Sequence, residues 1–312
     1  MKALLRLGTR GSPLALYQAE FVKARILRDF PMTGVEIVTI KTAGDRIRRE
    51  KSKPLETKSI FTREIEEALL AGGIDLAVHS AKDLAVRMSE GLRIGAVLER
   101  EDPRDCLLSS GHRKLSELPP EARVGTSSLR RKTQLLRLRP GFVVSELHGN
   151  VQTRLRKLDE GQFDAVILAL AGIRRLGLES HVSEIFAEEI FYPAPGQGII
   201  AVQSRAADAE TNEVLRSVHD RQTGIRFDCE RAFLETLEGG CRLPCGISTV
   251  LSGNILKASG IILAVDDPSY AEAHATGTPE APAALGVELA RQVLRDGGQA
   301  ILEKIREHYG QG

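Results

Sequence analysis

Short apolar runs alternate with amphipathic stretches along the first part of the chain. The apolar spacing after Pro13 has the period of a helix, and Ser12 before it is a favourable N-cap residue. In order, the patterns predict a strand at Leu4–Thr9, a helix from Ser12 to about Pro31, a strand at Val35–Lys41, a helix over Thr62–Ala71, and strands at Ile74–His79 and Leu92–Leu98. Strand, helix and strand in this order are typical of a βαβ unit, so we expect a parallel sheet.

The same alternation repeats after a polar segment, Glu99–Asp105, which is typical of a linker between domains. The repeat predicts strands at Arg123–Gly125, Phe142–Leu147 and Phe163–Leu170, with helices over Ser128–Leu138 and Val151–Asp159. Pro193–Gly198 has the composition of a second crossing, which returns the chain to the first domain. Two similar α/β domains joined by a hinge imply a ligand cleft outside the carboxyl ends of their strands.

The last third of the chain has a different order of elements. It predicts helices at Asp208–His219 and Thr223–Leu237, strands at Ile247–Leu251, Ile255–Val265 and Glu272–Thr276, and helices at Ala283–Asp296 and Gly298–Tyr309. We therefore expect a small α+β third domain. Cys241 lies at its start, directly after Gly239 and Gly240. By itself this loop has two interpretations, a helix C-cap beside an inert thiol or a flexible tip that carries a usable one.

Composition excludes several classes of protein. With 312 residues, 42% hydrophobic and 27% charged, the chain is typical of a globular protein of two or three domains. The longest apolar run, 165–173, is far short of the roughly 20 residues that span a bilayer. Arg6 and Arg10 interrupt the apolar stretch at the N-terminus, which is not typical of a signal peptide. Four cysteines give no disulfide framework and no convincing metal site, so we expect no metal and a reducing, cytoplasmic setting.

The net charge of +1 conceals a local concentration of basic residues. Between Arg123 and Lys157 there are nine lysines or arginines and one acid, Glu146. Such a concentration within a nearly neutral chain favours an anionic partner that binds locally. A solvated charged face is the alternative.

The segment Gly125–Lys132 lies where a strand is expected to pass into a helix. The hydroxyls of Thr126 and Ser128 and the free N–H groups of a helix N-terminus favour an anion, and Arg130 and Arg131 could add bidentate pairing. A plain N-cap followed by surface arginines is the alternative. Neither a Walker motif nor G-x-G-x-x-G is present, which favours a carboxylate over a nucleotide phosphate.

A second polar cluster, His79–Leu84, also follows a predicted strand. Lys82 could bind an anion there, and Asp83 could stabilise a developing cation or transfer a proton. A capping aspartate beside an exposed lysine is the alternative.

Several motifs in a fixed order make the chain similar to the porphobilinogen deaminase (hydroxymethylbilane synthase) family. They are Gly8–Ala15, His79–Leu84, Glu99–Asp105, Gly125–Arg131, Gly149–Arg154, Leu176–Leu178 and Leu237–Pro244. The resemblance implies two hinged, periplasmic-binding-protein-like α/β domains plus a small α+β C-terminal domain. The expected boundaries are 1–98 with 199–216, then 104–192, and then 221–312, which carries the cysteine loop.

The resemblance also implies an activity. Cys241 would hold a dipyrromethane cofactor through a thioether, and four porphobilinogens would be added stepwise with release of ammonia. Hydrolysis would then yield linear hydroxymethylbilane for tetrapyrrole and haem biosynthesis. Asp83 would face the pyrrole nitrogens, help to expel ammonia and stabilise a cationic azafulvene. The residues expected to bind substrate and cofactor carboxylates are Arg10, Ser12, Gln18, Lys82, Thr126, Ser128, Arg130, Arg131, His148, Arg154, Arg175 and Gln197.

His148 departs from the family, which usually has arginine before Gly-Asn, so this contact is expected to be neutral or pH-dependent. Two other functions fit the sequence less well. A non-catalytic hinged anion-binding protein would leave the third domain and Cys241 without a role. Nucleic-acid binding is disfavoured because four Tyr, nine Phe and no Trp leave few stacking platforms. We expect a monomer that acts on porphobilinogen without a nucleic-acid or membrane partner.

Overall fold

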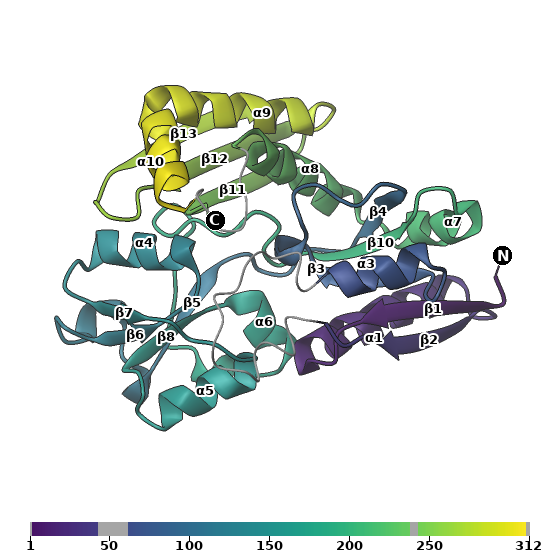
Figure 1. Ribbon diagram of the computed structural model, residues 1–312, viewed down its shortest axis with the longest axis horizontal. Coiled ribbons are helices and arrows are strands. Elements are labelled where there is room, and N and C mark those ends of the chain that lie inside the picture. Colours follow the sequence, from purple (N-terminus) through teal and green to yellow (C-terminus); the bar gives the residue numbers. More distant parts are fainter. Residues whose placement is uncertain (1, 43–61, 238–242, 310–312) are drawn as a thin grey trace. The chain divides into compact units, whose positions relative to one another are not determined.

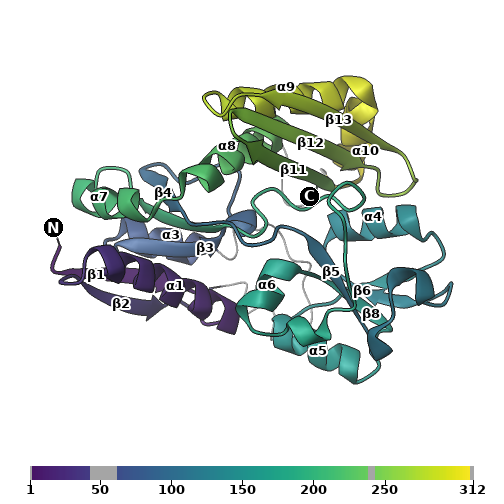
Figure 2. The same cartoon turned by 180° about the vertical axis from the view of Figure 1, so that it is seen from behind.

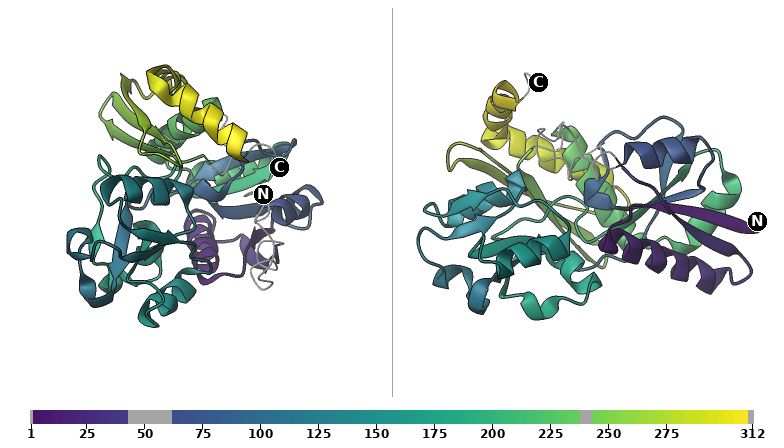
Figure 3. Two further views of the ribbon diagram at one scale, coloured as in Figure 1. Left: turned by 60° about the vertical axis from the view of Figure 1, so that its left-hand side comes forward. Right: turned by 60° about the horizontal axis from the view of Figure 1, so that its bottom comes forward.

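The computed structural model describes residues 2–42, 62–237 and 243–309, and its chain divides into two compact units (Figure 1). The first unit consists of Met1–Glu101 and Gly198–Gly224. The second consists of Asp102–Gln197 and Ile225–Gly312. Figures 2 and 3 show the elements of both units from other sides.

The first unit contains a mixed sheet with the strand order β2-β1-β3-β10-β4. Its strands are β1 (Leu4–Thr9), β2 (Gly34–Thr39), β3 (Leu76–Ser80), β4 (Leu92–Val97) and β10 (Ile200–Arg205). β1 runs parallel to β2 and β3, whereas β10 is antiparallel to β3 and β4. The expectation of a parallel sheet is therefore wrong for half of it. β10 enters after a chain crossing rather than through a βαβ connection, so no crossover helix requires it to be parallel.

Helices cover both faces of this sheet. α1 (Pro13–Asp29) and α7 (Ala209–Val218) pack on one face, where Val22, Leu76 and Leu215 are fully buried. α3 (Arg63–Leu70) packs on the other face with Ile65 and Ala77. Leu76 and Ala77 are neighbours in β3 and serve opposite cores, because successive strand residues point to opposite faces.

The second unit begins with a sheet of order β7-β6-β8-β5-β9. Its elements are β5 (Asp105–Ser109), β6 (Arg123–Gly125), α4 (Leu129–Leu138), β7 (Val143–Ser145), α5 (Val151–Asp159), β8 (Ala165–Ala169), α6 (Leu170–Arg175) and β9 (Glu184–Ile185). β7, β6 and β8 are parallel, and β5 is antiparallel to β8 and β9. The sequence patterns did not predict β5, and Asp105 belongs to this strand rather than to a linker. They also extended the strand before α6 to Leu170, which is the first residue of that helix.

Short 3-10 turns connect several of these elements. They are η2 (Ala81–Asp83), η3 (Ser110–His112), η4 (Leu115–Glu117) and η5 (Glu179–His181).

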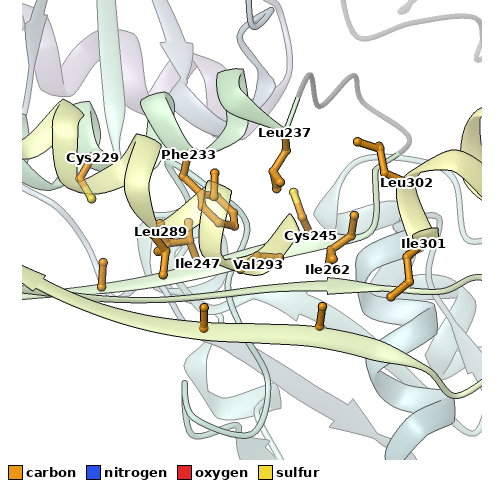
Figure 4. Close-up of a cluster of buried hydrophobic side chains, with 14 of the residues drawn as sticks. Cys229, Phe233, Leu237, Cys245, Ile247, Ile262, Leu289, Val293, Ile301 and Leu302 are labelled. Carbon is orange, nitrogen blue, oxygen red and sulfur yellow. The ribbon is translucent and has the colours of Figure 1, made fainter. Parts of the chain in front are cut away.

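The C-terminal part of the second unit is a small antiparallel sheet of order β11-β12-β13, with helices packed against it. Its elements are α8 (Arg221–Thr236) from Ile225 onward, β11 (Cys245–Ser252), β12 (Ile255–Leu263), β13 (Tyr270–Gly277), α9 (Pro282–Val293), the π-helical link η6 (Leu294–Gly298) and α10 (Gln299–Tyr309). Figure 4 shows their shared core, in which Phe233, Ile247, Leu289 and Val293 are fully buried. The predicted α/β class with a small α+β C-terminal part is confirmed.

Gly286 brings α9 unusually close to α8. A Cβ atom at this position would lie 2.1 Å from the carbonyl oxygen of Cys229 and 3.0 Å from the nitrogen of Phe233. Both contacts are with backbone atoms, which a side-chain rotation cannot relieve. A residue with a side chain at 286 would therefore force the two helices apart.

Gly286→Ala is expected to destabilise the protein by about 2 kcal/mol because of this overpacking. In an ordinary helix interior the same change stabilises by about 1 kcal/mol. Urea unfolding followed by circular dichroism measures the sign, and a stabilised variant would disprove the close contact.

Candidate active site

The predicted residues of the first unit lie at one edge of its sheet. β1 and β3 are parallel, so their carboxyl ends meet at the same edge. Arg10 directly follows β1, and Lys82 and Asp83 lie in η2 directly after β3. Ser12 is the N-cap of α1 at this edge and accepts a hydrogen bond from the Ala15 nitrogen at 3.3 Å. This edge therefore combines two cations, a carboxylate and a helix N-terminus.

The turn that carries Lys82 and Asp83 is held from two sides. Gln18, buried on α1, donates from Nε2 to the Ser80 hydroxyl at 2.9 Å. The Ala81 nitrogen donates to the Ile199 carbonyl at 2.9 Å. Gln18 thus holds the residue that precedes the turn through a partly buried hydrogen bond.

His79 lies beneath this turn as a neutral imidazole. It is 6% exposed, and burial lowers its pKa from 6.5 to about 4. The charges of Glu66 and Asp83 oppose the shift, and that of Arg10 favours it. Glu66 is itself buried and accepts from Gln203 at 2.9 Å and from Ser89 at 2.6 Å. His79 therefore adds no positive charge next to Lys82 and Asp83 at neutral pH.

The lowered pKa of His79 makes the stability of the protein depend on pH in a defined range. Because the folded pKa of His79 lies below its unfolded value, the unfolded chain binds more protons between about pH 6.5 and about pH 4. The free energy of unfolding should fall on acidification through this window, by up to about 3.4 kcal/mol from this group. Urea unfolding at several pH values should show a shallower decline in His79→Gln. Parallel curves for the two proteins would contradict the assignment.

In the second unit, the residues that follow β6 cap a helix. Ser128 is the N-cap of α4 and accepts from the Arg131 nitrogen at 3.4 Å. Thr126 is buried, and its hydroxyl accepts from the Ser128 nitrogen at 3.2 Å. β7, β6 and β8 are parallel, so these hydroxyls lie at the carboxyl edge of the second sheet.

Arg130 and Arg131 are both buried against Asp105. Arg131 donates from Nε and Nη2 to one carboxylate oxygen at 3.0 and 2.7 Å, and Arg130 Nη2 lies 2.8 Å from the other oxygen. Asp105 is 0% exposed, and the arginines are 5% and 6% exposed. Burial lowers the pKa of the Arg130 guanidinium, an effect that the Asp105 charge opposes. The surface arginines considered as an alternative are thereby excluded.

Backbone oxygens and Gln197 complete this buried cluster. Arg130 Nη1 donates to the Tyr192 carbonyl, and Arg131 Nη1 donates to the Ile167 carbonyl at 3.2 Å. Gln197 donates from Nε2 to Asp105 at 3.0 Å, and its oxygen lies 3.5 Å from Arg131 Nη2. Asp105 was not among the predicted site residues. Its signals in the sequence were its place at the end of the motif Glu99–Asp105 and its position directly before a short apolar run.

Asp105→Asn would leave two buried guanidinium groups without their carboxylate. We expect a loss of about 3–5 kcal/mol in the free energy of unfolding. Asp164→Asn is the matched control, because Asp164 pairs with an Arg123 side chain that is 51% exposed, and it should cost less than about 1 kcal/mol. Equal losses in the two variants would argue against a special role for the cluster.

The remaining predicted residues of the second unit lie in the segments that follow β7 and β8. His148 is exposed and lies between β7 and α5. Arg154, on α5, donates from Nε to the Gly149 carbonyl at 3.0 Å. Arg175 is the last residue of α6 and is half-buried. The structure thus places these three residues in segments that follow the parallel strands β7 and β8.

Cys241 lies outside the described residues. The described cysteines are core residues, since Cys106, Cys229 and Cys245 are buried. Burial raises the pKa of the Cys106 and Cys229 thiols to about 12. Thiols in such surroundings are poor nucleophiles at neutral pH.

Two family models match the chain. The model described as porphobilinogen deaminase, dipyromethane cofactor binding domain, matches residues 5–213. The model described as porphobilinogen deaminase, C-terminal domain, matches residues 225–295. Together they cover both units.

Curated relatives match over nearly the whole length. The protein named porphobilinogen deaminase from Syntrophomonas wolfei is 45% identical over 97% of this chain and 99% of its own. Those of the same name from Syntrophobacter fumaroxidans and Chlorobaculum tepidum are each 42% identical, over 97% and 98% of this chain and 98% and 99% of their own. Among solved structures, the methionine binding protein MetQ aligns with 73% of this chain and 95% of its own, at 14% identity and a TM-score of 0.45.

Proposed function

The chain belongs to the porphobilinogen deaminase family, and from that membership we propose that it is hydroxymethylbilane synthase, a transferase of tetrapyrrole and haem biosynthesis. It condenses four porphobilinogens onto a covalent dipyrromethane primer, releases ammonia at each addition, and hydrolyses the product to linear hydroxymethylbilane. The observation that carries this conclusion is the match to the family over nearly the full length of the chain and of its relatives.

The proposed anchor of the cofactor is Cys241. When bound there, the dipyrromethane supplies the pyrrole carbon to which the first substrate is joined. The described residues suit a group that carries carboxylates. Each sheet edge offers a helix N-terminus with a hydroxyl N-cap, Ser12 in one unit and Ser128 in the other, and cationic side chains lie near both.

Asp83 is the proposed catalytic carboxylate. Porphobilinogen loses its side-chain nitrogen as ammonia when the carbon–nitrogen bond breaks, and the electron pair leaves with the nitrogen. The positive charge that remains on the pyrrole is stabilised by a carboxylate opposite its N–H group. When the new carbon–carbon bond forms, the ring carbon of the acceptor loses a proton, and Asp83 can accept and pass on this proton. The neutral His79 beneath the turn adds no competing cation.

The other proposed residues bind acetate and propionate groups. In the first unit these are Arg10, Ser12, Gln18 and Lys82. In the second unit they are Thr126, Ser128, Arg130, Arg131, His148, Arg154, Arg175 and Gln197. Arg130 and Arg131 already share Asp105, so a bound carboxylate would join this cluster rather than meet two unpaired cations.

We also infer a division into three domains, 1–98 with 199–216, 104–192 and 221–312. The separate hydrophobic cores of the two sheets in the second unit support this division. We infer that the enzyme acts as a cytoplasmic monomer without a nucleic-acid or membrane partner. A small polyanionic product accounts for the basic residues between Arg123 and Lys157 without a nucleic acid. In the part of the chain that the structure describes, no helix has the length and apolarity to cross a membrane.

Two variants separate anchoring from chemistry. The intact wild-type protein should exceed its sequence mass by one dipyrrole, and Cys241→Ser should lose both this adduct and activity. Asp83→Asn should keep the adduct and lose at least about 100-fold in kcat, because its carboxylate is removed from the reacting pyrrole. Mass spectrometry and porphobilinogen consumption measure the two effects.

Asp159→Asn, on an exposed residue at the end of α5, is the matched control and should resemble wild type in both measurements. An active wild-type enzyme without an adduct would refute the anchor. Carboxylate binding without turnover in the wild type would instead support a non-catalytic anion-binding protein.

A further inference from the structure

The side chain of Tyr192 belongs to the C-terminal sheet of the second unit. It is 2% exposed and packs with Ile261 and Leu263 of β12 in one buried cluster. Its hydroxyl donates to Oε1 of Glu272, on β13, at 2.5 Å. The ring and the hydroxyl of Tyr192 are therefore held by two strands of this sheet.

The backbone of the same residue is bonded to α4. The Tyr192 nitrogen donates to Oε1 of Gln134 at 2.7 Å, and its carbonyl accepts from Nε2 of Gln134 at 3.1 Å. The same carbonyl accepts from Nη1 of Arg130, whose Nη2 lies 2.8 Å from a carboxylate oxygen of Asp105. The Arg130 guanidinium is thus held between two acceptors, and the position of the Tyr192 carbonyl contributes to its orientation.

The hydrogen bond between Tyr192 and Glu272 has a fixed direction. Burial raises the pKa of the Tyr192 hydroxyl, and the hydrogen bond to Glu272 and the charge of Glu272 add to the shift, so the hydroxyl keeps its proton at neutral pH. An ionised carboxylate can only accept. A hydrogen bond to an ionised acceptor is roughly twice as strong as one between neutral groups. This contact therefore restrains the ring and, through it, the backbone of Tyr192.

The strand after the proposed cofactor anchor lies against the same segment. β11 begins four residues after Cys241, and the nitrogen of Ile247 in this strand donates to the Pro193 carbonyl at 3.0 Å. Pro193 directly follows Tyr192. The sheet that follows the proposed anchor and the proposed carboxylate-binding residue Arg130 are thus joined through this short segment.

Resting on the proposed function, we propose that Tyr192 is a positioning residue for the binding of a substrate or product carboxylate at Arg130. Its hydroxyl, bonded to Glu272, holds the carbonyl that orients the guanidinium. Phenylalanine would fill the same space but would not bond to Glu272. The C-terminal sheet thereby orients a cation that binds the chain growing on the cofactor.

The KM for porphobilinogen tests this role on holoenzyme variants whose cofactor is verified by intact mass. Tyr192→Phe removes only the hydroxyl and should raise KM by about three- to tenfold, with a smaller change in kcat. Glu272→Ala should raise KM to the same extent. The double variant should be no worse than either, because all three lack the same hydrogen bond. Tyr270→Phe, the same substitution at a 47% exposed residue of β13, is the matched control and should keep the wild-type KM.

The guanidinium NMR signals of Arg130 provide a readout that does not depend on turnover. They should shift in Tyr192→Phe and in Glu272→Ala, and should keep their wild-type positions in Tyr270→Phe. Unshifted signals, an unchanged KM in Tyr192→Phe, or effects on KM that add in the double variant would overturn the proposal while the enzyme remains active. A wild-type protein that turns over no porphobilinogen would instead refute the proposed function, and the NMR comparison would still measure the link from Tyr192 to Arg130.

Discussion

The second unit depends on the burial of two guanidinium groups around one carboxylate. Such a cluster is tolerated only when the charges are paired and their remaining hydrogen bonds are satisfied. Asp105 supplies the pairing, and the carbonyls of Tyr192 and Ile167 accept further N–H groups. These contacts join α4 to β8 and to the segment that leads to Gln197, so they order the carboxyl edge of the sheet where the proposed site lies.

Burial divides the proposed carboxylate-binding residues of this edge into two kinds. Arg130 is buried and paired with the buried Asp105, whereas His148 is exposed and lies 2.7 Å from the exposed carboxylate of Glu146. A ligand carboxylate would join an existing buried ion pair at Arg130, and it would meet a solvent-exposed side chain at His148. The buried pair is positioned by its surroundings, and an exposed ion pair of this kind contributes little to stability.

In the first unit, the buried residues next to the turn that bears Asp83 are uncharged at neutral pH, namely Gln18 and His79. Gln18 and the pairing of β3 with β10 hold the turn that bears Asp83, and the buried His79 beneath it is uncharged at neutral pH. A protonated imidazole there would compete with a cationic pyrrole for the carboxylate. The desolvation that lowers the pKa of His79 therefore also preserves the electrostatic role proposed for Asp83.

Local patterns in the sequence were sufficient to predict most helices, the positions of the parallel strands and the polar motifs at their ends, because helical period, capping and strand length are properties of neighbouring residues. The order of these motifs was also sufficient to predict the family. Tertiary structure alone decided the direction of β5 and β10, the burial of Arg131 on a carboxylate 26 residues away, and the burial that lowers the pKa of His79. Strand direction, burial and protonation depend on partners that folding brings from distant parts of the chain, and a periodic pattern does not identify those partners.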